Sequence, residues 1–381
     1  MPRPDFIWAA ARGAISGRAQ TQLRLRTFQR VLIPGSKIGL QRSGVRFVSP
    51  SVRESSRATQ SVRWGALSEE IAMSLLAMIK PNGPSGFGYG STAEGVTAGL
   101  SLDGRTYLLT GCNSGLGFET LRVLTLRGAH VIAAARTLEK ARAACASVKG
   151  PTTPVACELA EPASVRATVA TVKALNIPID GIICNAGIMA LPKLNQAYGY
   201  ELQFFTNHVG HFMLVTGLIE ALTADARVTM LSSSAHTFAP KGGIEFDNLS
   251  GEKGYSAWRA YGQSKLANLL FAKELARRFT GTARKANALH PGVIFDTNLQ
   301  RSMNVPRVVL HAVAGLSNLI VLKSIPQGAA TQCYVATNPA LGAVSGQYFA
   351  DCNIAKPRAD AEDRSLAKRL WDVSEKIATA L

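Results

Sequence analysis

Short apolar runs and amphipathic segments alternate along the chain from about residue 92 onward. Apolar runs occur at Thr106–Thr110, His130–Ala134, Pro154–Cys157, Gly181–Cys184, Arg227–Leu231, Ala286–Leu289 and Gln347–Phe349. Most are continuous, which suits strands buried on both faces. Helical spacing appears at Gly117–Arg127, Leu138–Val148, Ser164–Leu175, Tyr198–Leu222 and Trp258–Phe279. The alternation predicts an α/β fold with a doubly wound parallel sheet of the Rossmann type in a single catalytic domain.

The first 91 residues do not follow this alternation. Residues 1–64 hold 12 Lys and Arg against two acids, which is +10 of the chain's net charge of +17. A short helix is predicted at Ser68–Ile79, before a Pro/Gly/Ser linker at 81–92. We therefore expect a basic Arg/Ser-rich extension at 1–64, a helix and linker at 65–91, and the sheet domain at 92–381.

The composition of residues 1–64 is that of an organelle transit peptide, because it is rich in Arg and Ser and poor in acids. A disordered basic tail and a wrongly assigned gene start are the alternatives. No aromatic residues are interleaved with the arginines, so a nucleic-acid-binding arm is disfavoured. We expect a plastid or mitochondrial protein, or a cytoplasmic or membrane-associated one if the extension is not a targeting signal.

Cysteine usage and hydropathy exclude several other classes. The six cysteines include no C-x-x-C pair and no cluster with His, so we expect no metal site. Isolated cysteines in apolar strands suit a reducing compartment. The chain contains no run of 18 apolar residues, so no membrane-spanning helix is expected.

A glycine-rich loop follows the first predicted strand and leads into a helix. The glycines of Gly111-x-x-x-Gly115-x-Gly117 allow a tight turn and the close approach of a pyrophosphate, and the helix N-terminus offers free N–H groups. A lone glycine triplet is a common turn, but its place between strand and helix favours dinucleotide binding. The expected cofactor contacts in this loop are Thr110, Gly111, Asn113, Ser114, Gly115, Leu116 and Gly117.

The end of the second strand indicates which dinucleotide binds. An NAD site usually has a carboxylate here for the adenosine ribose, whereas this chain has Arg136, which could pair with the 2′-phosphate of NADP(H). The alternative is a surface arginine. Glu158, followed by Leu159, ends the third strand and could approach the adenine. Asn185, Ala186 and Gly187 follow the fourth strand and would let the cofactor ribose pass close to the backbone.

Tyr261 and Lys265 are four residues apart on a predicted helix and share one face. An ammonium one turn away would lower the pKa of the phenol and make it a general acid and base. The Ser232–Ser234 run ends a strand and offers a hydroxyl to a substrate carbonyl. Asn207 is flanked by His208 and His211, which we interpret as buried helix residues.

In this order, the motifs resemble those of the short-chain dehydrogenase/reductase family over roughly residues 92–375. The resemblance implies a catalytic tetrad of Asn207, Ser233, Tyr261 and Lys265, with Tyr261 as proton donor, Lys265 also holding the nicotinamide ribose and Asn207 holding a relay water. It selects Ser233 over its neighbours and adds cofactor contacts at Pro291, Gly292, Val293 and Thr297.

The resemblance extends to one branch of the family, through segments such as Tyr261–Asn268, Leu289–Gly292, Pro326–Ala330 and Gly346–Cys352. This is the retinol dehydrogenase branch, which includes a WW-domain-containing oxidoreductase and a plant short-chain dehydrogenase of the chloroplast inner-envelope translocon. Two positions depart from the family pattern: four residues instead of three separate Gly292 from Thr297, and Glu158 replaces the usual Asp.

Together the motifs and the resemblance predict an NADP(H)-dependent oxidoreductase. An apolar lid at about 298–325 suggests a small lipophilic carbonyl or alcohol substrate, such as a retinoid, steroid or aldehyde. A packed lid helix is favoured over peripheral membrane association. The alternative function is an NADPH-binding, redox-sensing regulatory subunit of an organelle membrane complex. The chain is expected to be a monomer or a homodimer.

Overall fold

The computed structural model describes residues 79–294 and 322–381. The expected extension at 1–64, the predicted helix before residue 79, the lid up to residue 321 and Thr297 lie outside this part of the chain. Within it, no helix is both long enough and apolar enough to span a membrane.

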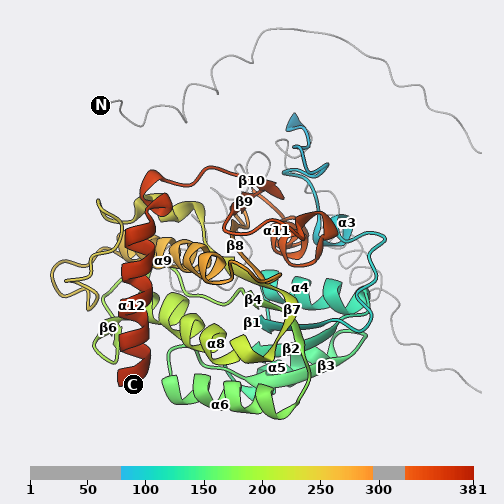
Figure 1. The fold of residues 1–381 in the computed structure, drawn as a ribbon, viewed down its shortest axis with the longest axis horizontal. Coiled ribbons are helices and arrows are strands. Elements are labelled where there is room, and N and C mark those ends of the chain that lie inside the picture. Colours follow the sequence, from blue (N-terminus) through green and yellow to red (C-terminus); the bar gives the residue numbers. More distant parts are fainter. Residues whose placement is uncertain (1–78, 295–321) are drawn as a thin grey trace, which may run out of the picture. The chain divides into compact units, whose positions relative to one another are not determined.

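An eight-stranded sheet forms the centre of the described domain, in the order β10-β9-β8-β7-β4-β1-β2-β3 (Figure 1). The strands are β1 Thr106–Thr110, β2 His130–Ala135, β3 Thr152–Ala156, β4 Ile179–Cys184, β7 Leu222–Leu231, β8 Lys285–His290, β9 Tyr348–Ala350 and β10 Asn353–Ile354. All neighbours pair in parallel except β9 and β10. The predicted parallel sheet is confirmed.

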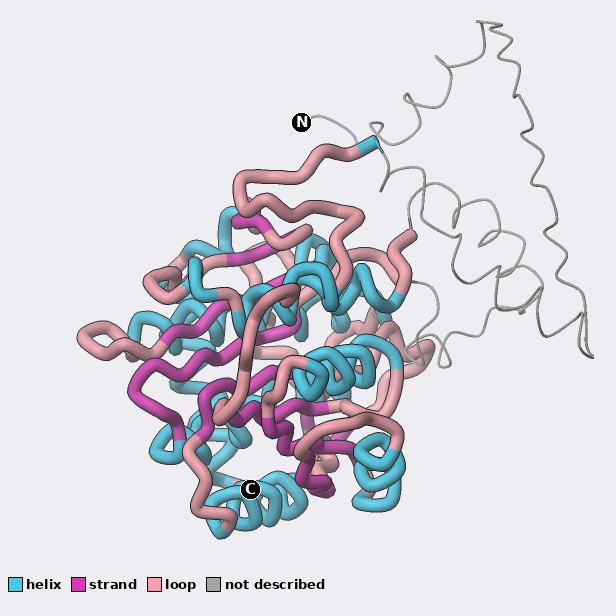
Figure 2. Tube along the Cα trace, turned by 90° about the vertical axis from the view of Figure 1, so that its right-hand side faces the viewer, coloured by secondary structure: helices cyan, strands magenta, loops and turns pink. Residues whose placement is uncertain are grey.

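Helices cover both faces of this sheet, as the two views in Figures 1 and 2 show. One apolar cluster joins the sheet to α3 Ala93–Val96, α4 Gly115–Leu126, α5 Leu138–Ala146 and α11 Ile325–Thr337. A second cluster on the opposite face joins it to α6 Pro162–Ala174, α8 Gly210–Leu218, α9 Ala257–Arg278 and α12 Arg364–Ala380. Short 3-10 helices lie at Ile219–Ala221, Ser234–Phe238, Pro339–Leu341 and Ala359–Glu362. A parallel sheet buried on both faces explains the continuous apolar runs.

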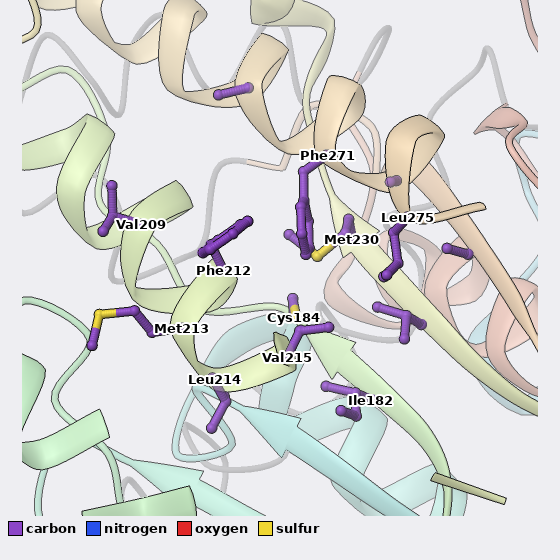
Figure 3. Packing of buried hydrophobic residues seen from close by; sticks show 14 of the residues in the cluster. Ile182, Cys184, Val209, Phe212, Met213, Leu214, Val215, Met230, Phe271 and Leu275 are labelled. Atoms are coloured by element: carbon purple, nitrogen blue, oxygen red, sulfur yellow. The ribbon is translucent and has the colours of Figure 1, made fainter. Parts of the chain in front are cut away.

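The core beneath α8 and α9 holds in place the segments that carry Asn207, Tyr261 and Lys265. In Figure 3, Phe212 and Val215 of α8 face Phe271 of α9, with Met230 of β7 nearby. The Phe212 and Phe271 ring centroids are 5.4 Å apart. Truncating one such buried ring to alanine typically costs about 3–5 kcal/mol of stability. This packing fixes α9, which carries Tyr261 and Lys265.

The predicted helix Tyr198–Leu222 is confirmed in its interior, where helical turns run from Leu202 to Ala221, but both of its ends were wrong. Its first residues form a hairpin of β5 Gln196–Ala197 and β6 Tyr200–Glu201, turning through the positive φ angles of Tyr198 and Gly199. Helix begins only at α7 Leu202–Phe204, where the Glu201 side chain accepts a hydrogen bond from the Phe204 N–H. A π-helical turn, Phe205–Val209, then leads into α8. Strand β7 begins at Leu222, five residues earlier than predicted.

The Pro/Gly-rich residues before α3 contact the sheet domain. The Asn353 side chain accepts a hydrogen bond from the Ser85 N–H and donates one to the Phe87 carbonyl. The Phe87 ring also packs edge-on against Tyr334 of α11. These contacts attach the segment to β10 and α11.

Candidate active site

The loop between β1 and α4 brings two backbone segments into direct contact. A Cβ atom at Gly117 would lie 2.0 Å from the Gly111 carbonyl oxygen, so no side chain fits there. Gly111 itself has a φ of +71°, a conformation that favours glycine. Ser114 caps α4 without a side-chain hydrogen bond, which leaves first-turn N–H groups for an anion. The loop therefore fits a pyrophosphate.

Thr110 connects this loop to the segment that follows β4. Its hydroxyl oxygen accepts hydrogen bonds from the backbone N–H groups of Asn185 (3.0 Å) and Ala186 (3.1 Å). The Asn185 amide donates in return to the Thr110 carbonyl at 2.9 Å. With both acceptor positions used, the Thr110 hydroxyl donates to Nε2 of His211 (2.9 Å). Nδ1–H of His211 then donates to the Asn207 carbonyl at 2.9 Å.

The expected adenosine contacts lie at the ends of β2 and β3. Arg136 directly follows β2 and is exposed, and its guanidinium has no hydrogen bond or ion pair with the rest of the described chain. Glu158 is half-buried, and its carboxylate accepts from the Ala160 N–H of its own loop at 3.2 Å. Leu159 is buried, and its backbone packs closely against Gly210. A Cβ atom at Gly210 would lie 2.3 Å from the Leu159 carbonyl oxygen.

Asn207 lies fully buried in the π-helical turn Phe205–Val209. Its Oδ1 accepts from the Ile188 N–H (2.8 Å), and its Nδ2 donates to the Ile188 carbonyl and the Ser264 hydroxyl, both at 2.9 Å. The side chain thus ties the segment after β4 to α9. Single π turns inside helices are often found at functional sites. That Asn207 binds the water of a proton relay stays a prediction.

Tyr261 and Lys265 lie one turn apart on α9, and both are buried. The Lys265 ammonium donates to the Leu231 carbonyl at 3.1 Å and is 5.7 Å from the centre of the Tyr261 ring. Gly262 lets the helix lie against the next loop, because a Cβ there would be 2.6 Å from the Ala235 carbonyl oxygen. That loop begins with Ser233, so this contact brings the serine to Tyr261.

The pKa of Tyr261 corrects one expectation from the sequence. Burial raises it to about 12, and hydrogen bonding to Ser233 opposes this. Lys265 is not among the groups that set this pKa, and its ammonium donates to the Leu231 carbonyl. Burial also lowers the pKa of Lys265 to about 8. At neutral pH Tyr261 therefore carries its proton and Lys265 is still mainly charged.

The remaining expected residues follow β7 and β8. Ser233 is half-buried, and its hydroxyl accepts from the Ala235 N–H at 3.2 Å. Pro291, Gly292 and Val293 continue from β8, and the Lys323 side chain lies against Gly292, which has a φ of +102°. The Val293 carbonyl accepts from the Lys323 N–H at 2.9 Å.

Gly187 occupies the point where the two halves of the site meet. A Cβ there would be 2.9 Å from Oδ1 of Asn207 and 3.4 Å from the Lys265 nitrogen. The absent side chain allows a ribose to pass between the glycine loop and Lys265. These residues therefore fit a nicotinamide dinucleotide lying from the β2 end toward Tyr261.

Sequence reasoning assigned no role to two linking residues. Ser264 accepts from Asn207 and donates to the Tyr261 carbonyl at 2.8 Å, so it connects the π turn to α9. His211 joins Thr110 to the Asn207 backbone. Ser264 lies inside the Tyr-x-x-x-Lys motif, and His211 is four residues from Asn207. Their positions beside these motifs were the only sequence signal that could have pointed to their linking roles.

The fold and the glycine loop define a dinucleotide-dependent oxidoreductase. A family model for short chain dehydrogenases matches residues 105–307, and the chain belongs to this family. The short-chain dehydrogenase TIC 32 B, chloroplastic, of Brassica napus is 42% identical over 313 residues, covering 78% of this chain and 96% of that protein.

Retinol dehydrogenase 14 of Homo sapiens is 37% identical over 294 residues, covering 72% of this chain and 86% of that protein. Among solved structures, a Mycobacterium paratuberculosis protein described as uncharacterized has a TM-score of 0.60 at 32% identity, covering 74% of this chain and 97% of that one. The predicted family and its retinol dehydrogenase-like branch are confirmed. Membership implies oxidoreductase activity with a nicotinamide cofactor.

Proposed function

We propose that the protein is an NADP(H)-dependent oxidoreductase acting on a carbonyl or alcohol of a lipophilic substrate. The observation that carries this proposal is the buried pair of Tyr261 and Lys265 beside Gly187, with Ser233 close enough to oppose the rise in the pKa of Tyr261. When bound, the nicotinamide supplies hydride to a carbonyl carbon or takes it from an alcohol carbon. The residues around it position the substrate and move the proton.

In the reduction direction, Ser233 donates a hydrogen bond to the substrate oxygen and Tyr261 gives it a proton as negative charge develops there. The high pKa of Tyr261 keeps the phenol protonated for this step. Lys265 has three N–H donors and uses one on the Leu231 carbonyl. The others are available to the ribose hydroxyls of the cofactor.

Arg136 supports NADP(H) over NAD(H). The Arg136 guanidinium is exposed and has no partner within residues 79–294 and 322–381, so it can form charge-assisted hydrogen bonds with a 2′-phosphate. No carboxylate competes for the ribose at the end of β2. The 2′-phosphate of NADP(H) could therefore pair with Arg136 without breaking a contact that Arg136 makes in the described chain.

Two exposed aromatic side chains support a lipophilic substrate. Phe238 is 58% exposed and Trp258 is 44% exposed. Their ring centroids are 6.3 Å apart, and Trp258 is 6.2 Å from the Tyr261 ring. Together they form an apolar path from the surface to the proton donor. A substrate with a long apolar tail can lie along it.

The test is a titration of the full chain with NADPH and NADH, followed by turnover of all-trans-retinal and of propanal. We expect tighter binding of NADPH, preference for retinal, and loss of turnover but not of NADPH binding in Tyr261→Phe. Trp258→Ala should raise KM for retinal and leave that for propanal unchanged. NADPH binding without turnover of either carbonyl would contradict the proposed enzyme activity and favour a redox-sensing regulatory subunit.

We also propose a plastid location. The basic, acid-poor residues 1–64 and the chloroplastic relative at 42% identity support it. Fractionation of the source cells, with N-terminal sequencing of the purified chain, tests this. Recovery from mitochondria or from the cytoplasm would contradict the proposal.

A further inference from the structure

The backbone at Ser233 and Ser234 is held by two histidine side chains. The Ser233 carbonyl accepts from Nδ1 of His236 at 2.6 Å and from the His236 backbone N–H at 3.1 Å. The next N–H, that of Ser234, donates to Nδ1 of His290 at 3.1 Å. The peptide group that follows the catalytic serine is thus bonded at both its oxygen and its nitrogen.

These contacts determine where each histidine carries its proton. Nε2 of His236 accepts from the Arg358 backbone N–H at 3.2 Å, so the proton of His236 must be on Nδ1. Nδ1 of His290 is an acceptor, so its proton is on Nε2. Charging either ring would add a proton to its acceptor nitrogen, which would then face the backbone N–H group that donates to it. Both must therefore remain neutral.

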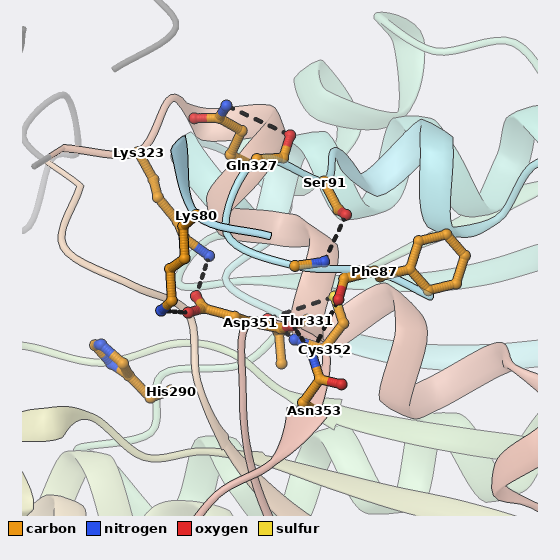
Figure 4. Close-up of polar contacts among 12 residues, drawn as sticks. Lys80, Phe87, Ser91, His290, Lys323, Gln327, Thr331, Asp351, Cys352 and Asn353 are labelled. Atoms are coloured by element: carbon orange, nitrogen blue, oxygen red, sulfur yellow. Dashed lines mark hydrogen bonds and ion pairs between the residues drawn. The ribbon is translucent and has the colours of Figure 1, made fainter. Parts of the chain in front are cut away.

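The surroundings favour the neutral rings. Burial lowers the pKa of His236, the charge of Arg358 acts in the same direction, and the Ser233 carbonyl and Asp360 oppose it. Burial lowers the pKa of His290 to about 4, helped by Lys323 and His236 and opposed by Asp351. Figure 4 shows Lys323 and Lys80 both directed at Asp351, with His290 below them.

Arg358 fixes the rest of the loop from the C-terminal side. Its guanidinium donates to the carbonyls of His236 (3.2 Å), Thr237 (3.4 Å), Ala239 (2.8 Å) and Pro240 (3.0 Å). It also pairs with Asp360. On the other side, Gly262 lies against the backbone of the same loop. The loop is therefore held between α9 and a segment more than 100 residues away in sequence.

We propose that His236, His290 and Arg358 form a serine clamp, a set of positioning residues that hold the Ser233 hydroxyl where it meets Tyr261 and the substrate oxygen. None of the three needs to touch the reacting atoms. The proposal rests on the proposed function for the role of Ser233. The geometry of the clamp is independent of the proposed function, because the proton positions of the two histidines can be measured without substrate.

The first test is ¹⁵N NMR of the full chain with labelled histidine at pH 7, with signals assigned through His236→Gln and His290→Asn. We expect a neutral His236 with its proton on Nδ1, the less common tautomer in water, and a neutral His290 with its proton on Nε2. A charged His236, or one protonated on Nε2, would overturn the clamp. A protein without turnover would refute the proposed function and leave this result standing.

The second test separates positioning from stability by a double-mutant cycle between Arg358→Met and Ser233→Ala. We expect Arg358→Met to lower kcat about 10- to 100-fold when Ser233 is present, because small displacements of a catalytic group are costly. In the Ser233→Ala background the further loss should be under about threefold, since the effect passes through the serine. Equal losses in both backgrounds would overturn the proposal.

Histidine variants provide the matched control. In His290→Asn, Oδ1 takes the place of Nδ1 and can accept from Ser234, whereas His290→Leu has similar bulk and no acceptor. We expect the Asn variant to keep most of kcat and the Leu variant to lose it, with the same affinity for NADPH. Equal activity of the two would contradict a role for the His290 hydrogen bond.

Discussion

The two sides of the site are held in place by different means. On the cofactor side, residues 106–174, the shape depends on glycines whose missing side chains let backbones touch, as at Gly111 and Gly117. On the proposed catalytic side, residues 202–294 and 322–381, buried polar side chains hold the backbone segments in place. Asn207 and Arg358 each make several hydrogen bonds to segments that are distant in sequence.

The difference has a chemical reason. A pyrophosphate needs backbone N–H groups at close range, and a glycine loop supplies them from one short segment. A proton donor needs a buried, low-dielectric setting in which several groups from different strands meet. That setting favours side chains that hydrogen-bond to the buried polar atoms around them. The cofactor side should therefore be sensitive to added atoms, and the catalytic side to lost hydrogen bonds and to protons.

The largest effect is expected for Gly117→Ala. The new methyl group would lie 2.0 Å from the Gly111 carbonyl oxygen, so the loop and α4 must move apart. We expect NADPH affinity to fall about 100-fold or more, since forced overpacking costs about 1–3 kcal/mol or more. Isothermal titration measures this. Gly95→Ala in α3 is the control, because its methyl group would meet only the end of the Thr92 side chain. Equal affinities of the two variants would contradict the close-contact argument.

The same contrast explains what could be read from the sequence. The parallel sheet, the glycine loop and the Tyr261–Lys265 spacing are local patterns, and the fold that they predict is confirmed. The hairpin at 196–201 depends on contacts such as the Glu201 N–H donating to the Leu249 carbonyl, which no local pattern reveals. Arg358 is 122 residues from His236. Its role appears only once the chain has folded.

Acid should destabilise the catalytic side more than the cofactor side. Burial lowers the pKa of His208 to about 3 and that of His211 to about 4. Between pH 6.5 and 4 the unfolded chain therefore binds protons that the folded chain does not, so stability falls as pH falls through this window and is unaffected above it. At pH 5 each histidine should cost about 2 kcal/mol of the free energy of unfolding.

Urea unfolding at pH 7, 6 and 5 measures this dependence. His208→Gln should be less stable at pH 7 but should lose less stability on acidification than the unmodified chain. The comparison variant is His130→Gln, which removes the half-exposed histidine at the start of β2 and should change the pH slope less. A slope that His208→Gln leaves unchanged would mean that other groups cause the acid sensitivity.

The smallest effect is expected for Arg136→Ala, since this side chain is exposed and makes no hydrogen bond or ion pair with the described part of the chain. We expect about a 10-fold loss of NADPH affinity from the lost charge-assisted contacts, and more at low ionic strength. NADH affinity should not change. Arg142→Ala removes the same charge from an exposed position on α5 and should leave both affinities unchanged. Equal losses of NADPH and NADH affinity in Arg136→Ala would mean that Arg136 does not contact the 2′-phosphate. Recognition on the cofactor side would then depend on backbone alone.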